Sequence, residues 1–198
     1  MGENKLLYKN MPPEELIVLS QNNDYKALEE LIKRVQYDVF ATLSYLLKEN
    51  NNISDLTQEV LLKIAKNITG LKNPACFKGW LNHIITNTYY DFARKSNRRP
   101  QTVSLEYTCE PANFALKIEI PDKKVKPFEK CISSECEKMI KNAIRQLPEN
   151  FRIAIILREF QGLSYEEIAK TTNTSIGTVK SRISRARLKL QDALKNYI

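Results

Sequence analysis

The stretch from Leu163 to Leu190, LSYEEIAKTTNTSIGTVKSRISRARLKL, predicts two helices joined by a short polar turn. Ser164 and Glu167 have the spacing of a capping box, in which side chain and backbone satisfy each other's hydrogen bonds at a helix N-terminus. The polar run 171–174 ends the first helix, and Ser175 can cap the second. Two helices in this arrangement form a helix-turn-helix, which places its second helix in the major groove of DNA.

The second of these helices has one apolar side and one basic side. Apolar residues recur at steps of three and four, the spacing of a buried helical face: Ile176, Val179, Ile183, Ala186 and Leu190. From Ser175 to Ile198 the chain carries six Lys or Arg against one Asp. A solvated amphipathic helix is the alternative, but the capped partner helix in front of it favours DNA binding.

A helix of similar composition is predicted from about residue 75 to residue 97, before Pro100 ends it. Phe77, Trp80 and Leu81 begin its apolar stripe, and aromatic and basic residues alternate on its other side and toward its C-terminus. Aromatic rings can stack on bases while cations follow the phosphates, so this pattern suits single-stranded DNA. The alternative is that the rings belong to the core and the basic residues favour the helix dipole.

The remaining periodicity is helical as well. Pro12–Glu15 opens a short helix, Asp24 begins a long one, and Ser54 is expected to cap a third. Periodicity is lost from residue 101 to residue 127 and returns at Phe128. The sequence therefore predicts an all-α fold with two small helical domains, residues 1–100 and 128–198, joined by the irregular linker 101–127. The C-terminal domain is expected to be a helix-turn-helix of winged-helix type without a wing.

Composition limits the function classes. The formal net charge of +8 favours a polyanionic partner, and a hydrophobic content of 42% suffices for packed cores. The single histidine, His83, and four widely spaced cysteines argue against a metal site, and no constellation meets the geometric demands of catalysis. We therefore expect a protein that is not an enzyme and needs no cofactor or metal. The Met1 segment lacks a signal pattern and no run approaches the roughly 20 apolar residues that span a bilayer, so we expect the protein to be cytoplasmic. Cys136 is expected in the core.

Three segments, in order, resemble the extracytoplasmic-function group of bacterial sigma factors. DLTQEVLLKI, from Asp55 to Ile64, is similar to the segment by which that family binds core RNA polymerase. FKGWLNHIITNTYYDFARK, from Phe77 to Lys95, is similar to the helix that melts and reads the −10 promoter element. LPENFRIAIILREFQGLSYEEIA with GTVKSRISRARLKL resembles the domain that reads the −35 element.

The resemblance implies a role for individual residues. Contacts with core polymerase would come from Asp55, Leu56, Gln58, Glu59, Leu62 and Lys63. Contacts with melted −10 DNA would come from Asn82, Asn87, Tyr89, Tyr90, Asp91, Arg94, Lys95, Arg98 and Arg99. Contacts with double-stranded −35 DNA would come from Ser175, Thr178, Lys180, Ser181, Arg182, Ser184, Arg185 and Lys189. Among the last group, Arg182 and Arg185 are expected to read bases, since arginine pairs well with guanine in the major groove.

The implied function is promoter-specific initiation of transcription. The implied partners are core RNA polymerase, promoter DNA and an anti-sigma factor that restrains the protein. Two other readings remain open. One is a regulator that binds operator DNA through its helix-turn-helix without binding polymerase, and the other is an adaptor that binds a protein through its acidic N-terminal helices.

Overall fold

The computed structural model describes residues 3–49, 51–98 and 127–195, and every regular element within these ranges is a helix, which confirms the predicted all-α class. The N-terminal part consists of α1 (Glu3–Asn10), α2 (Pro13–Gln21), α3 (Tyr25–Leu46), α4 (Ile53–Asn67), the short 3-10 turns η1 (Ile68–Gly70) and η2 (Pro74–Cys76), and α5 (Phe77–Arg98). The C-terminal part consists of α6 (Pro127–Gln146), α7 (Glu149–Ile155), η3 (Ile156–Phe160), α8 (Tyr165–Thr172) and α9 (Ile176–Leu194).

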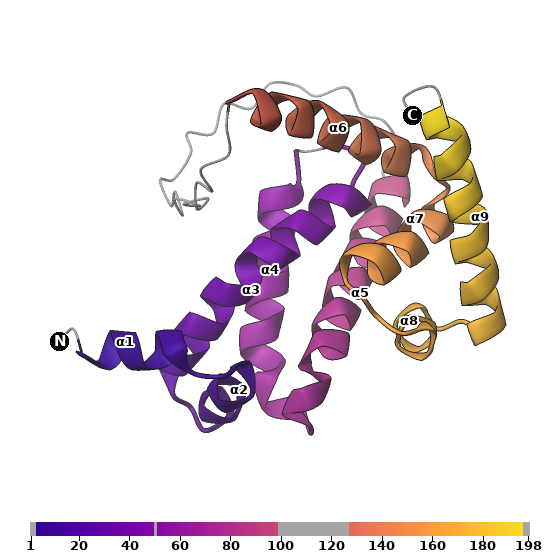
Figure 1. The fold of residues 1–198 in the computed structure, drawn as a ribbon. Helices are drawn as coiled ribbons and strands as arrows, with labels where there is room; N and C mark the ends of the chain where they lie inside the picture. The colour runs from indigo at the N-terminus through magenta and orange to yellow at the C-terminus, as the bar shows by residue number, and fades with distance from the viewer. Residues whose placement is uncertain (1–2, 50, 99–126, 196–198) are drawn as a thin grey trace.

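The N-terminal domain is built around α3, which lies beside α4 and α5 (Figure 1). The N-terminus of α3 is capped by Asp24, whose Oδ1 accepts hydrogen bonds from the backbone N–H groups of Lys26 at 2.9 Å and Ala27 at 3.1 Å. The apolar stripe of α3 is buried at Leu31, Val35, Val39 and Leu43, as its periodicity predicts.

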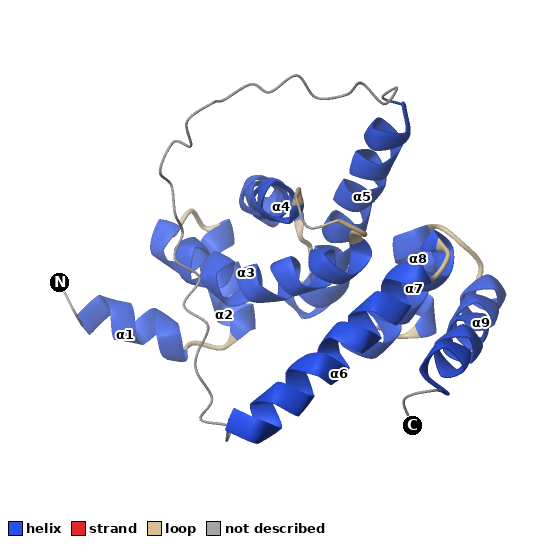
Figure 2. Ribbon diagram, turned by 90° about the horizontal axis from the view of Figure 1, so that it is seen from above, coloured by secondary structure: helices blue, strands red, loops and turns tan. Residues whose placement is uncertain are grey.

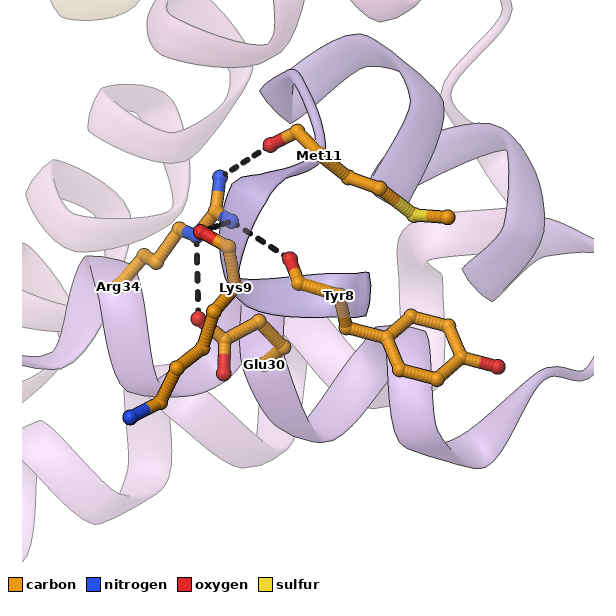
Figure 3. A network of polar contacts seen from close by, with 5 residues as sticks. All are labelled: Tyr8, Lys9, Met11, Glu30 and Arg34. Carbon is orange, nitrogen blue, oxygen red and sulfur yellow. Dashed lines mark hydrogen bonds and ion pairs between the residues drawn. The ribbon is translucent and has the colours of Figure 1, made fainter. Parts of the chain in front are cut away.

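A single arginine of α3 fixes the last turn of α1 and the residue that follows it (Figure 3). The Arg34 guanidinium donates to the carbonyl oxygens of Tyr8 at 2.7 Å, Lys9 at 2.9 Å and Met11 at 2.8 Å. The first two of these carbonyls lie in the last turn of α1, where no partner is available within the helix. Glu30 accepts from Arg34 Nε at 3.2 Å and completes the network. The end of α1 is thus attached to α3 through its backbone, while α2 packs on α3 through its buried Leu16 and Ile17.

In the C-terminal domain, α7 runs directly into the π-helical turn η3. Gln161 N–H donates to the carbonyl of Ile156 at 3.1 Å, the five-residue step of such a turn. Gly162 then adopts a φ of 62°, which glycine tolerates without strain and which ends the helix as its position predicts. This wider turn carries Phe160 and Gln161 toward the N-terminal domain.

The two domains pack against each other and share one core. A continuous cluster of buried side chains extends from Val35 and Leu43 of α3, through Ile85 of α5, to Ile156 and Val179 of the C-terminal domain. In Figure 2, α3, α4 and α5 lie on one side and α6 to α9 on the other.

Two helix starts differ in how they are capped, and this difference can be measured. At the start of α8, Glu167 N–H donates to Ser164 Oγ at 3.1 Å and Ser164 N–H donates to Glu167 Oε2 at 2.8 Å, so the predicted capping box is present. At the start of α4 the prediction is wrong: the N-cap residue is Asn52, no side chain caps the helix, and Ser54 lies exposed inside the first turn.

We therefore expect Ser164→Ala to lower the free energy of unfolding by about 1 kcal/mol. Ser54→Ala is the matched control and should change it by less than about 0.5 kcal/mol. Thermal and denaturant unfolding of the full chain would measure both. An equal loss from the two variants would contradict the assignment of the caps.

Candidate nucleic-acid interface

The helix-turn-helix consists of α8, a tight turn and α9. Asn173 ends α8 in the left-handed conformation with a φ of 51°. Ser175 then caps α9 by accepting a hydrogen bond from Thr178 N–H at 3.1 Å. On α9, Val179, Ile183 and Ala186 are fully buried against the domain. The local order of caps and apolar residues therefore fixes which side of α9 remains available for a partner.

The predicted −35 residues lie mostly on the available side of α9, which is the helix at the right edge of Figure 1. The structure exposes Ser175, Lys180, Ser181, Ser184, Arg185 and Lys189 and half-buries Thr178 and Arg182. In the described ranges, neither Arg182 nor Arg185 forms an ion pair. Arg187 differs, since its guanidinium donates to Glu159 Oε1 at 2.6 and 3.2 Å. Within the described part of the chain, Arg182 and Arg185 thus form no ion pair, whereas Arg187 is paired with Glu159.

The predicted −10 residues on α5 fall into two groups. Asn87, Asp91, Arg94 and Lys95 are exposed, with Asn87 Nδ2 at 2.9 Å from His83 Nε2 and Asp91 at 3.9 Å from Arg94 Nη1. The Arg98 side chain and all of Arg99 lie outside the described residues.

Other predicted −10 residues on α5 are not accessible in this arrangement. Asn82 is 0% exposed, Tyr89 is 4% exposed and Tyr90 is half-buried. Tyr89 Oη accepts a hydrogen bond from Arg152 of α7 at 2.9 Å. Burial is the largest influence on the pKa of Tyr89 and raises it, against the opposing effect of Arg152. The sequence pattern predicts Asn82 and Tyr89 on the side of α5 opposite its apolar stripe, and the structure buries both because the C-terminal domain covers this side.

The segment predicted to bind polymerase forms the exposed side of α4. Asp55, Gln58 and Glu59 are exposed, and Leu62 has 59% of its surface in solvent. Lys63 lies beside them, 2.7 Å from Glu59 Oε1 and 3.0 Å from Thr88 Oγ1. An apolar side chain framed by acids and an amide is a typical centre for a protein contact.

One member of that predicted set is not on the exposed side. Leu56 is 4% exposed and shares the buried stripe of α4 with Val60 and Ile64. As a core residue it supports the helix and does not offer its side chain to a partner.

Two family descriptions match separate parts of the chain. Residues 31–99 match the family described as Sigma-70 region 2, and residues 137–190 match Sigma-70 region 4. The chain is 31% identical over 187 residues to the ECF RNA polymerase sigma-E factor of Haemophilus influenzae, covering 94% of this chain and 97% of that protein. The chain belongs to the extracytoplasmic-function sigma factors.

Two further relatives and one solved structure agree with this membership of the sigma factor family, and a second solved structure shares the fold. The chain is 33% identical to the sigma-E factor of Escherichia coli K12, over 92% of this chain and 94% of that protein. It is 32% identical to the sigma-H factor of Pseudomonas aeruginosa, over 92% of this chain and 93% of that protein. The sigma factor RpoE of Bartonella quintana, solved with the anti-sigma factor NepR, has a TM-score of 0.64 at 27% identity over 86% of this chain and 98% of that one. The structure of CnrH with the cytosolic domain of CnrY shares the fold, with a TM-score of 0.63 at 19% identity over 93% and 97%.

Two residues of this sigma factor that sequence reasoning missed join its domains. Arg152 is 3% exposed and bonds to Tyr89, while Gln161 Nε2 donates to Thr42 Oγ1 of α3 at 2.6 Å. The role of Arg152 could have been predicted from the sequence, because it is the one charged residue in the apolar run from Phe151 to Leu157. A charge buried with such a run needs a hydrogen-bonding partner.

The described ranges of the sigma factor contain no group of residues that could hold a metal ion and no helix that could cross a membrane. Cys136 is exposed, which corrects its expected place in the core. Among the α6 side chains that the structure describes, Ala143 and Ile144 near the C-terminus of the helix are buried, while Glu135 to Lys138 are all exposed.

Proposed function

We propose that this sigma factor binds core RNA polymerase through the exposed side of α4 and directs it to promoters read by α5 and α9. In this assignment α9 enters the major groove of double-stranded −35 DNA, and α5 holds the melted −10 strand. The protein would contribute specificity and no catalysis of its own, and would act in the bacterial cytoplasm, where its polymerase is found.

The observation that carries the proposal is the outward basic side of α9. Arg185, Lys180 and Lys189 are exposed on one helix that is capped and packed as a helix-turn-helix requires. Arginine and lysine at such positions bind guanine and phosphate. The acidic, leucine-centred side of α4 lies on the other domain, which leaves it available for polymerase while α9 binds DNA.

An anti-sigma factor is the proposed restraint on this protein. The support is that the Bartonella quintana sigma factor, which aligns with 86% of this chain, was solved in complex with the anti-sigma factor NepR. We propose a partner of the same class for this chain.

The deciding experiment mixes the purified full chain with core RNA polymerase that lacks any sigma factor. We expect co-elution on size exclusion and new transcription start sites on fragments of the host genome, with core polymerase alone as the control. DNA binding by the chain without affinity for core polymerase would contradict the proposal. The alternative, a regulator that binds operator DNA without polymerase, would then be favoured.

A further inference from the structure

The exposed side of α5 carries a row of polar residues at four-residue steps, His83, Asn87 and Asp91. Side chains four residues apart on a helix lie close enough to contact each other. The amide nitrogen of Asn87, Nδ2, lies 2.9 Å from His83 Nε2. Asp91 has a different neighbour, since its Oδ1 lies 3.9 Å from Arg94 Nη1. Among the described residues, Asn87 is therefore paired with the preceding member of the row and not with the following one.

This contact defines which end of the Asn87 amide faces the imidazole ring. An amide nitrogen can only donate, so His83 Nε2 accepts, and the proton of the neutral ring is then on Nδ1. The opposite orientation would bring Asn87 Oδ1 to the ring and would require a proton on Nε2 instead. In the described ranges Asn87 forms no other hydrogen bond, so Oδ1 and the second N–H of Nδ2 are available to a partner.

The orientation of an asparagine amide decides which bases it can bind with two hydrogen bonds. An unstacked base can be read on its pairing edge. On that edge adenine and cytosine present an amine donor beside a ring nitrogen that accepts, whereas guanine and thymine present a carbonyl acceptor beside a ring N–H that donates. The oxygen and nitrogen of the amide have nearly the same shape, so a free amide can turn over and match either class. An amide held in one orientation matches only one class.

The pair lies where a DNA strand can reach it. His83 and Asn87 are both exposed, unlike the buried Asn82 and Tyr89 of the same helix. In water, a contact between neighbours on a helix stabilises their arrangement only weakly. Once a bound base excludes water, an acceptor left without its donor costs more free energy. The orientation set by His83 therefore has its largest effect when Asn87 contacts a base.

We propose that His83 is a positioning residue for recognition of the −10 element. It holds the Asn87 amide in one orientation and so restricts the base that Asn87 reads to one of the two classes, adenine and cytosine or guanine and thymine. This inference rests on the proposed function, because it takes α5 as the surface for melted DNA. His83 acts through Asn87.

The test changes the hydrogen-bonding character of position 83 and measures base preference. His83→Glu offers only acceptors and should keep the amide nitrogen toward position 83, whereas His83→Lys offers only donors and should turn the amide over. His83→Ala removes the partner. Each variant is assembled with core RNA polymerase, and initiation is measured on templates that carry each of the four bases at every −10 position of a promoter that the wild type transcribes. The ratio between templates is the readout, because a changed charge on α5 acts through the phosphates and affects all templates alike.

We expect the wild type to favour one class over the other by about tenfold at one −10 position, within the range that a contact with two hydrogen bonds supplies. His83→Glu should retain this preference, His83→Ala should largely abolish it, and His83→Lys should invert it. Position 83 is exposed, so the substitutions should leave the fold intact. If His83 had only a structural role, its loss would lower initiation on all templates and leave the ratio unchanged, and that result would overturn the proposal.

Asn87→Ala provides the matched control in a double-mutant cycle. Without the amide there is nothing to orient, so substitutions at position 83 should leave base preference unchanged in this background. A preference that still changes with His83→Lys would overturn the proposal, and so would a preference that survives Asn87→Ala alone. Failure of the proposed function has a different signature, since the wild type would then support no transcription with core polymerase on any fragment of the host genome.

Discussion

Glu59→Lys is expected to weaken the binding of core polymerase by about 2–4 kcal/mol, because reversing a charge inside a protein interface sets like charges against each other or leaves a partner unpaired. Glu59 lies on the exposed side of α4 between Asp55 and Leu62. It also pairs with Lys63 at 2.7 Å, so the substitution replaces an attraction within the helix by a repulsion. Co-elution and competition titration with labelled core polymerase would measure the loss.

The matched control for this charge reversal is Glu29→Lys. Glu29 forms the same kind of ion pair, four residues before Lys33, on α3 and outside every proposed contact surface. Both pairs are exposed, so each reversal should change the free energy of unfolding by less than about 1 kcal/mol. Binding of duplex −35 DNA should be unchanged in both variants. If Glu59→Lys binds polymerase as well as Glu29→Lys does, the assignment of α4 is wrong.

The helix-turn-helix could be predicted from the sequence because its determinants are local. Ser164, Glu167 and Ser175 act on backbone groups within three residues of themselves, and the apolar residues of α9 recur at helical spacing. The structure has the caps at the predicted positions and buries Val179, Ile183 and Ala186. The prediction is wrong for Ile176, which is 40% exposed in the first turn of α9, and Leu190 is only half-buried. Local capping and periodicity together therefore decide which side of α9 is exposed.

The covered side of α5 could not be predicted in the same way. Tyr89 is buried by Arg152, which is 63 residues away, and Asn82 lies against Gln161, 79 residues away. Helical periodicity marks one apolar stripe and carries no information on a second domain that packs on the polar side. The burial of Leu56 was predictable, because Leu56, Val60 and Ile64 recur at the four-residue spacing of one helical face. The family resemblance assigns the whole segment to polymerase binding and does not separate its buried residues from its exposed ones.

Arg182→Ala and Arg185→Ala are each expected to weaken binding to −35 duplex by about 1–3 kcal/mol and to relax sequence preference at the contacted base pair. Neither guanidinium forms an ion pair in the described part of the chain, so its donors are available to guanine O6 and N7. Affinities for a promoter duplex, single-base variants of it and random DNA at several salt concentrations would give both the loss and its specificity.

The two arginines are not equivalent, and the structure indicates which one gives the cleaner result. Arg182 is half-buried, and its charge opposes the burial that raises the pKa of Tyr90 on α5. Arg185 is exposed, so its loss should report on DNA alone, whereas Arg182→Ala can also alter the contact between domains. Scattering of the free variants would separate the two effects.

Arg187→Ala is the matched control for these substitutions. Arg187 lies on the same helix as Arg182 and Arg185, but its guanidinium is held by Glu159 of η3 at 2.6 Å. It should lose far less affinity for the promoter duplex than Arg185→Ala does. A loss from Arg185→Ala that is equal on promoter and random DNA, with the salt dependence reduced by about one ion, would make Arg185 a phosphate contact and remove its role in reading sequence.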